Sequence, residues 1–431
     1  MKRGKKSTEL LALLLVLPFL LSMSSIGVKG AAAQGLGENV IKLGVAGALK
    51  RPYGIATVTG AEMASKEINA AGGVLGAKIQ LFSADTEGTA PKATEAIEKL
   101  RYADKVDNIV GAFTSEEATA FQEESAKLKI NILLDGAGYI LDKRFMAEPQ
   151  KYKYYWNYCP SENDYLESVL TNQLPLFVNT CKKTMGLGKV NVGILTDMAL
   201  WTESMHAGYV KGVKANPDCN LVYVGKISRD ATDFAAELTE MRTKEVQLVL
   251  TAMGYAACYT FIKQAYDVKL PAVIIGMNVQ SWATSDFLKA VGVDAAAYNS
   301  TVACISLPTT RNTDRLLKIY ERQYGGTFNL TVGVTYNGVK AYAKAVERAK
   351  SLDQDKVQKE LEKVRLPESE VWGSRDFYFD DAHRVKNSAR SGVILYTIQF
   401  TPNGSLIMID PPAYKTGDLM LPPWMIKAWK K

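Results

Sequence analysis

The residues best placed to hold a ligand lie in segment 108–121, which reads NIVGAFTSEEATAF. Ile109 and the valine after it are β-branched and predict a short buried strand, and Gly111 allows a sharp turn after that strand. Thr114 stands three residues before Glu117, which is the capping-box pattern of a helix N-terminus. Such a terminus presents free N–H groups that favour a carboxylate or another anion. The same pattern also fits a helix that caps itself and binds no ligand.

Residues suited to catalysis are sparse. His206 lies on an expected helix beside an apolar stripe, and His383 lies in a charged loop, so both fit structural positions. The sequence contains no HExxH or GxSxG motif, and segment 186–189 (GLGK) lacks the spacing and the hydroxyl residue of a P-loop. We therefore predict that the chain is not an enzyme, holds no metal and needs no cofactor. A secreted hydrolase with a dispersed Ser, His and Asp set is the enzymatic alternative.

The start of the chain carries the pattern of a targeting segment. Basic residues are followed by the apolar run 10–21 and by small residues that end in three alanines at 31–33. This order is typical of a secretory signal peptide, so we predict that residues 1–33 are removed and that the protein is periplasmic or extracellular. The alternative is an uncleaved anchor that leaves the protein membrane-tethered, because residues 10–28 approach membrane-spanning length, although Pro18 weakens that alternative.

Composition limits the class of partner. The chain of 431 residues carries +7; residues 1–33 hold five basic residues and one acidic residue, a net +4, so the other 398 carry +3. This balance, with no basic helix, argues against a nucleic-acid partner. A body of this length favours two domains, and no second apolar run in it approaches spanning length.

The five cysteines all lie beyond the signal segment, in a compartment that permits disulfides. Their wide spacing argues against a zinc or redox motif, and Cys159 with Cys181 is the expected bridge because the two are close in sequence. An odd count leaves at least one thiol free. Glycosylation sequons at Asn299, Asn329 and Asn403 predict surface positions.

Strand and helix patterns alternate along the chain in two successive sets. The first set has strands at 40–45, 78–83, 109–110 and 130–134, and helices at 60–71 and 90–104. The second set has strands at 190–195, 221–226, 246–251 and 272–275, and helices at 201–215, 233–243 and 256–266. This order predicts an α/β protein with two doubly wound parallel-sheet lobes.

The later segments are each too small to fold alone, so we expect them to join sheets already formed. These are helices 339–350 and 356–364 and strands 377–379 and 393–400. The predicted division is lobe 1 at 39–158 plus about 305–379, lobe 2 at 159–304 plus about 380–403, and a C-terminal tail at 404–431. A cleft between two lobes is a natural ligand site.

Several segments carry a resemblance to a known family: IKLGVAG at 41–47, EINAAGGVLG at 67–76, Asp85 at a strand end and VGAFTS at 110–115. The chain resembles the extracytoplasmic solute-binding proteins of ABC transporters, in the branched-chain amino acid (leucine/isoleucine/valine)-binding class. The INAxGGxxG run is the most specific element. This resemblance implies the type I periplasmic binding protein fold, in which two lobes are joined by a multi-crossing hinge. Segment 411–431, rich in Pro and Trp, lies beyond the resemblance.

The resemblance implies ligand contacts from the first lobe. Family members bind a ligand carboxylate through a serine hydroxyl and backbone N–H groups at the turn found here, where Ser115 matches and Thr114 lies beside it. The loop after the next strand supplies backbone contacts, and Ala137 and Gly138 fall in that loop. Gly138 replaces a hydroxyl-bearing residue of the family, so one contact is lost. Tyr53 is the expected aromatic wall of a shortened first loop.

It also implies contacts from the second lobe. Trp201 takes the place of a family tyrosine, and Tyr255 matches the tyrosine after the third strand; both also fit ordinary packing positions. Asn278 replaces the acidic residue that meets a ligand ammonium. We hypothesise that Asp135, or alternatively Glu116, supplies the counter-charge instead, although each also fits a simpler role as a solvated loop residue or a helix-dipole partner.

These observations predict a monomer that binds a small polar solute outside the membrane and delivers it to the permease of an ABC transporter by cleft closure. A branched-chain or related amino acid is the first expectation for the ligand. The alternatives are an amide, a carboxylate or another solute, a ligand-sensing ectodomain, and the secreted hydrolase named above.

Overall fold

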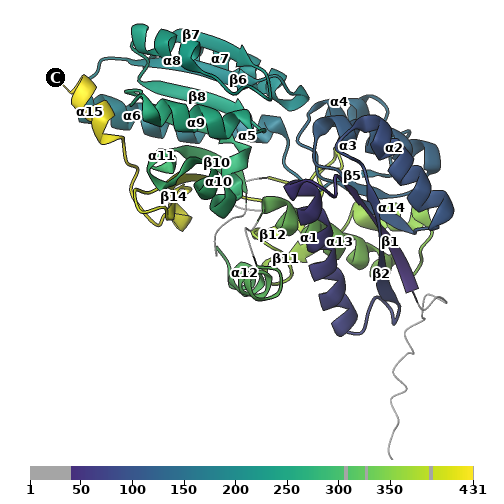
Figure 1. The fold of residues 1–431 in the computed structure, drawn as a ribbon. Helices are drawn as coiled ribbons and strands as arrows, with labels where there is room; N and C mark the ends of the chain where they lie inside the picture. Colours follow the sequence, from purple (N-terminus) through teal and green to yellow (C-terminus); the bar gives the residue numbers. More distant parts are fainter. Residues whose placement is uncertain (1–39, 305–308, 326–328, 388–391, 431) are drawn as a thin grey trace, which may run out of the picture. The chain divides into compact units, whose positions relative to one another are not determined.

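The first parallel sheet is built from five short strands whose side chains are mostly buried. In this computed structural model, which describes residues 40–304, 309–325, 329–387 and 392–430, the strand order is β2-β1-β3-β4-β5 (Figure 1). The strands are β1 (Val40–Gly47), β2 (Lys78–Asp85), β3 (Asn108–Gly111), β4 (Ile132–Leu134) and β5 (Tyr155–Asn157). All neighbouring strands run parallel, with register pairs such as Val110 to Leu133 and Leu133 to Trp156.

Helices cover both faces of this sheet because its strands carry apolar side chains on both sides. They are α1 (Pro52–Ala70), α2 (Ala90–Glu98), α3 (Ser115–Leu128), α4 (Ile140–Ala147) and, from later in the chain, α13 (Leu330–Ala349). Leu43 and Val110 belong to the core that includes α1 and α13, whereas Ile109 and Ile132 belong to the core under α2 and α3. Gly60 allows α1 to lie directly against α13, because a Cβ there would be 2.3 Å from the carbonyl oxygen of Val332.

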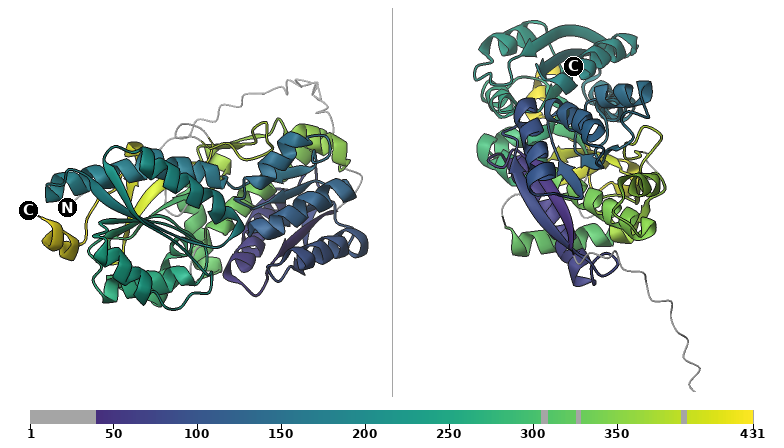
Figure 2. Two further views of the ribbon diagram at one scale, coloured as in Figure 1. Left: turned by 90° about the horizontal axis from the view of Figure 1, so that it is seen from above. Right: turned by 90° about the vertical axis from the view of Figure 1, so that its right-hand side faces the viewer.

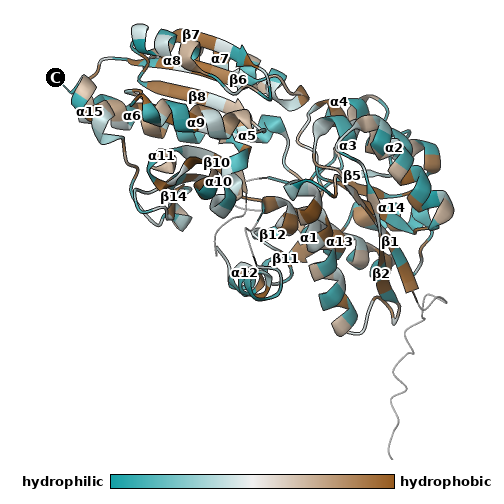
Figure 3. Cartoon of the chain, viewed as in Figure 1, coloured by the Kyte–Doolittle hydropathy of each residue, from teal (hydrophilic) through white to brown (hydrophobic). Residues whose placement is uncertain are grey.

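The second parallel sheet has the strand order β7-β6-β8-β9. Its strands are β6 (Val190–Asp197), β7 (Cys219–Ile227), β8 (Leu248–Met253) and β9 (Val273–Asn278). The helices α6 (Leu174–Met185) and α7 (Leu200–Ala215) share one core with this sheet, and α8 (Ala235–Thr243) and α9 (Ala257–Asp267) share another. Two further views show strands and helices of both sheets (Figure 2), and β8 is mostly apolar (Figure 3), with Thr251 as its polar residue. The predicted α/β class with two parallel sheets is confirmed.

The remaining segments return to these sheets or form small sheets of their own. A three-stranded antiparallel sheet joins β10 (Ser300–Cys304), β13 (Leu395–Phe400) and β14 (Leu406–Asp410), and β11 (Arg365–Pro367) pairs with β12 (Asp376–Tyr378). The other helices include α5 (Glu162–Ser168), α10 (Thr284–Val291), α11 (Val293–Ala296), α12 (Arg311–Gln323), α14 (Gln354–Leu361) and α15 (Pro423–Trp429). Segments beyond 304 thus contribute helix α13 to the first sheet and strands to the antiparallel sheet.

Two expectations about covalent chemistry are wrong. The bridge expected between Cys159 and Cys181 is absent, because all five cysteines are free and buried. Asn299 is 7% exposed and its amide donates to the carbonyls of Ala295 and Ala296, so its predicted surface position is incorrect. Asn403, in contrast, is exposed.

The predicted signal peptide, residues 1–33, lies outside the described residues. Among the residues that are described, no helix has both the length and the apolar character needed to cross a membrane.

Candidate functional site

The N-terminus of α3 forms the first wall of the candidate site. Thr114 caps the helix: its Oγ1 accepts a hydrogen bond from the Glu117 N–H at 3.2 Å, and Glu117 Oε2 accepts one from the Thr114 N–H at 3.1 Å. The predicted capping box is therefore confirmed. Ser115 and Glu116 are the first two residues of the helix, where a backbone N–H has no acceptor within the helix. The Ser115 hydroxyl forms no hydrogen bond with another described residue, so these donors are available to a ligand.

The loop after β4 forms the second wall. Asp135 in this loop is 4% exposed. Burial raises the pKa of its carboxyl to about 7, against the opposing effect of nearby groups that include the Arg384 guanidinium. Gly138 lies against Ser115, since a Cβ on Gly138 would be 3.0 Å from the Ser115 Oγ. A carboxyl that changes protonation near neutral pH therefore lies close to the helix N-terminus.

Residues after the strands of the second sheet form the opposite wall. Trp201 is the second residue of α7 and packs over Gly254, where a Cβ would be 3.2 Å from the indole ring. The Gly254 N–H donates to Asp197 Oδ2 at 2.7 Å, which fixes the turn that carries Tyr255. The Tyr255 hydroxyl accepts a hydrogen bond from Arg229 at 3.1 Å, and the Arg229 guanidinium lies 4.9 Å from the centre of the Tyr255 ring.

These walls line a cavity of about 50 Å³. Six of the nine residues predicted for the site line it: Thr114, Ser115, Asp135, Ala137, Trp201 and Tyr255. They follow strands of both sheets at their carboxyl ends, which is where α/β sheets bind ligands.

The other three predicted residues lie around the cavity rather than in its lining. Gly138 is behind the Ser115 side chain. Asn278 is buried at the end of β9, where its Oδ1 accepts a hydrogen bond from the Thr251 hydroxyl at 2.7 Å and its Nδ2 has no partner among the described residues. Tyr53 stacks on Phe113 with ring centres 4.5 Å apart and lines a wider cleft of about 870 Å³ that shares Phe113, Thr114 and Tyr255 with the cavity.

Sequence reasoning missed most of the apolar lining. The missed residues are Phe113, Cys159, Tyr165, Gly254, Met277, Val279, Trp282 and Leu330. Tyr165 lies on α5. A capping box formed by Ser161 and Asp164 marks the start of this helix and could have predicted it from the sequence. Five aromatic side chains line the cavity in total, including Trp201 and Tyr255, so its walls are predominantly apolar.

An ion pair bridges the two sides of the wider cleft. Arg229 Nη1, from the loop after β7, lies 3.3 Å from Glu116 Oε1 at the start of α3. Glu116 Oε2 is buried and has no hydrogen-bond partner in the described part of the chain. This pair and Tyr255 connect the residues that follow one sheet with those that follow the other.

A profile of the family described as "Periplasmic binding protein" matches residues 40–394. The chain belongs to this family. The predicted family is thereby confirmed, and so is the prediction that the protein is not an enzyme, because the family is non-enzymatic.

This periplasmic binding protein is similar to proteins whose names refer to branched-chain amino acids. It is 23% identical, over 371 residues, to "Leu/Ile/Val-binding protein homolog 7" of Brucella abortus (strain 2308), which covers 84% of this chain and 88% of that protein. A branched-chain amino acid transporter substrate binding protein from Streptococcus pneumoniae, solved with isoleucine, matches with a TM-score of 0.71 at 18% identity, over 86% of this chain and 100% of that chain.

A second solved structure that resembles this periplasmic binding protein contains a different ligand. It is a solute binding protein of an ABC transporter from R. palustris in complex with benzoate, with a TM-score of 0.68 at 16% identity, over 88% of this chain and 98% of that chain. These likenesses confirm the predicted type I fold. Because one fold holds both an amino acid and an aromatic acid, the fold does not fix the ligand of this protein.

The chemistry of the site in this periplasmic binding protein suits capture rather than catalysis. His206 bonds to Thr196 outside the cavity, and His383 stacks on Trp156. No group of three His, Cys, Asp or Glu side chains that could hold a metal occurs in the described ranges. The cavity instead combines hydrogen-bond donors at a helix N-terminus with aromatic walls, which suits a small solute that has an anionic group and an apolar body.

Proposed function

We propose that this protein binds a small carboxylate-bearing solute with an apolar body and delivers it to an ABC permease. One observation carries the proposal: Ser115, at the N-terminus of α3, lines the same cavity as Trp201 and Tyr255, which come from the other sheet. A carboxylate at the α3 N-terminus would use the free N–H groups and the Ser115 hydroxyl. The apolar body would lie among the aromatic side chains.

The proposed mechanism is closure of the cleft around the ligand. Because residues after both sheets line the cavity, a ligand that contacts both favours the closed form over the open form. The ion pair between Arg229 and Glu116 would add a direct contact in the closed form. The permease would then recognise that form, after export directed by the predicted signal peptide.

A branched-chain or related amino acid is the first candidate ligand. Its ammonium needs a compensating charge in a buried site, and Asn278 offers only an amide. Asp135 lines the cavity and is the proposed partner of the ammonium. The homologue named for Leu, Ile and Val binding supports this candidate.

An aromatic carboxylate is the second candidate. Two observations favour it: five aromatic side chains line the cavity, and a protein of the same fold was solved with benzoate. Such a ligand has no ammonium, so Asp135 would have to be neutral beside it.

The test is a binding panel on the purified protein without residues 1–33. Thermal-shift and calorimetric measurements would compare leucine, isoleucine and valine with their des-amino acids and amides, and with benzoate and 4-hydroxybenzoate. We expect the carboxylates to raise the melting temperature and the matching amides to have much smaller effects. Failure of every carboxylate to bind, or turnover of esters or amides by the protein, would contradict the proposal.

A further inference from the structure

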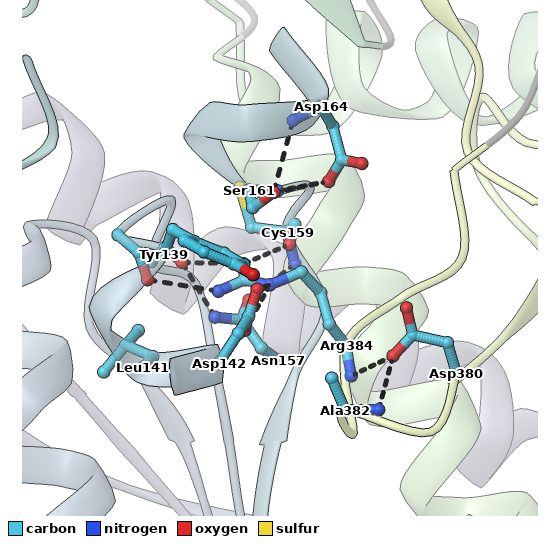
Figure 4. Close-up of polar contacts among 12 residues, drawn as sticks. Tyr139, Leu141, Asp142, Asn157, Cys159, Ser161, Asp164, Asp380, Ala382 and Arg384 are labelled. Carbon is cyan, nitrogen blue, oxygen red and sulfur yellow. Dashed lines mark hydrogen bonds and ion pairs between the residues drawn. The ribbon is translucent and has the colours of Figure 1, made fainter. Parts of the chain in front are cut away.

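A buried arginine lies directly behind the ligand-facing loop 135–139. Arg384 is 2% exposed, and its backbone pairs with the edge of the first sheet: the Val385 N–H donates to the Asn157 carbonyl at 2.7 Å, and the Asn157 N–H donates to the His383 carbonyl at 2.8 Å. The guanidinium is thereby held in place from a segment far away in sequence. Figure 4 shows it among the loop, Asp142 and Cys159.

The guanidinium donates to several backbone carbonyls at once. Its Nη1 donates to the Gly136 oxygen at 3.0 Å and to the Cys159 oxygen at 2.8 Å, and its Nη2 donates to the Gly138 oxygen at 3.3 Å. Its Nε donates to both carboxylate oxygens of Asp142, at 2.8 and 2.9 Å. Asp142 neutralises the charge, so the remaining donors are free to orient the loop.

All three carbonyls in the middle of the loop are occupied by protein donors. Besides the bonds from Arg384, the Ala137 oxygen accepts from the Glu162 N–H at 2.7 Å, and the Gly136 oxygen also accepts from Asn157 Nδ2 at 2.7 Å. The N–H groups of residues 136–138, in contrast, form no hydrogen bond with any described residue. At Ala137, which lines the cavity, the loop therefore has an N–H group without a protein acceptor, while the carbonyls of 136–138 are occupied.

We propose that Arg384 is a positioning residue that selects for an anionic ligand group by holding this loop in its donor-presenting conformation. Two glycines make the loop prone to peptide flips, and a flip would exchange an N–H for a carbonyl that repels a carboxylate. The peptide that joins Gly136 to Ala137 is the one concerned, because its N–H belongs to Ala137, which lines the cavity, and its carbonyl accepts from Arg384. The Gly138 carbonyl, which also accepts from the Leu141 N–H at 3.1 Å, anchors the end of the loop. This inference rests on the proposed function in one respect, which is that the ligand carries a carboxylate.

The test compares variants that separate positioning from stability. Arg384→Lys keeps the charge but lacks the fork that spans two carbonyls. The double variant Arg384→Met with Asp142→Leu removes the buried pair together and should recover much of the stability that Arg384→Met alone loses. Arg348→Lys is the matched control; Arg348 is exposed on α13 and pairs with Glu360 on α14.

The main readout is the ratio of affinities for a carboxylate and its matching amide, with benzoate against benzamide and isoleucine against isoleucinamide. We expect Arg384→Lys and the double variant to lower this ratio about tenfold or more, the range for a lost hydrogen bond to a charged group, and the control to leave it unchanged. A purely structural role would change both affinities together. The inference would be overturned if the affinity ratio were unchanged in both Arg384→Lys and the double variant. It would also be overturned if the double variant regained both the wild-type stability and the wild-type affinity ratio.

Crystal structures of the ligand-free wild type and the double variant test the same inference without a ligand. We expect at least one of the Gly136 and Gly138 carbonyls to rotate toward the cavity in the variant. An unaltered loop would refute the positioning role. If no carboxylate binds the wild type, the proposed function fails on its own, and these structures still decide the role of Arg384.

Discussion

Replacing Asp135 by asparagine should stabilise the ligand-free protein at neutral and alkaline pH. Burial raises the pKa of this carboxyl from 3.8 to about 7, so the folded protein keeps a proton that the unfolded chain has already lost. The contribution of Asp135 to the stability of the wild type therefore falls as pH rises from about 4 to about 7 and stays level above that range. At about 1.4 kcal/mol per pKa unit, ionising Asp135 costs about 4 kcal/mol at pH 8 as an upper value. Asparagine has nearly the same shape and carries no charge.

The assay is urea unfolding of the ligand-free wild type and Asp135→Asn between pH 4.5 and pH 8. The variant should gain little at pH 4.5, and its advantage should grow through pH 7 to as much as about 4 kcal/mol. Burial also raises the pKa of Glu162 to about 7 and of Asp197 to about 6, but both groups are present in both proteins and largely cancel in the difference. Asp267→Asn, at an exposed pair on α9, is the matched control and should change little.

A pH-independent difference between Asp135→Asn and the wild type would refute the reasoning, because it would mean that Asp135 does not titrate between the two states. Loss of stability at pH 8 would refute it more strongly. The same variant tests the counter-charge hypothesis: stabilisation by leucine, isoleucine or valine should disappear in Asp135→Asn if the carboxylate meets their ammonium. Stabilisation that persists would remove Asp135 from that role.

Two further variants test the opposite walls of the cavity. Ser115→Ala should weaken binding of the ligand carboxylate by about 1.5–3 kcal/mol with little change in melting temperature, because it removes one hydrogen bond to a charged group; unchanged affinity by calorimetry would contradict this. Tyr255→Ala should lower affinity and also reduce the ligand-induced compaction seen by small-angle scattering, because it removes a contact from the second sheet's side. If that variant binds and compacts as the wild type does, Tyr255 is a packing residue.

Much of the fold could be predicted because its central strands are rich in apolar, β-branched residues and its helices have recognisable start and stop residues. The strand at Val190–Asp197 and the capping box at Thr114 are examples in which the local sequence decides the local structure. Helix α1 begins eight residues earlier than expected, at Pro52, which occupies the first helical turn where a missing N–H costs nothing. Strand β5 was missed because its Tyr-Trp-Asn sequence resembles a packing segment; it pairs with β4 on one edge and bridges on the other to the segment around Arg384, more than two hundred residues away.

The site was predictable where it depends on strand ends and not where it depends on distant partners. The carboxyl ends of parallel strands share one edge, so Ser115, Ala137 and Tyr255 could be expected to lie near the ligand cleft. Asn278 also ends a strand, but its side chain bonds to Thr251, while its neighbours Met277 and Val279 reach the cavity lining. A shift of one residue along a strand reverses the direction of the side chain. The sequence alone does not determine where a strand ends to within one residue, so it does not determine which side chain points into the cavity.

The protonation of Asp135 gives the two candidate ligands opposite pH dependence. Its carboxyl lies beside the Cys159 thiol, with Arg384 and Glu117 contributing charge nearby. An amino acid ligand requires the charged carboxylate, so its affinity should rise, by up to about tenfold per pH unit, as pH increases toward 7. An aromatic carboxylate requires the neutral acid, which donates a hydrogen bond and does not repel, so its affinity should fall as pH increases from about 7. Calorimetric titrations of isoleucine and benzoate between pH 5.5 and pH 8.5 measure both slopes. If the affinity of the ligand that binds does not change with pH, or changes equally in Asp135→Asn, then the protonation of Asp135 does not determine which ligand charge is bound.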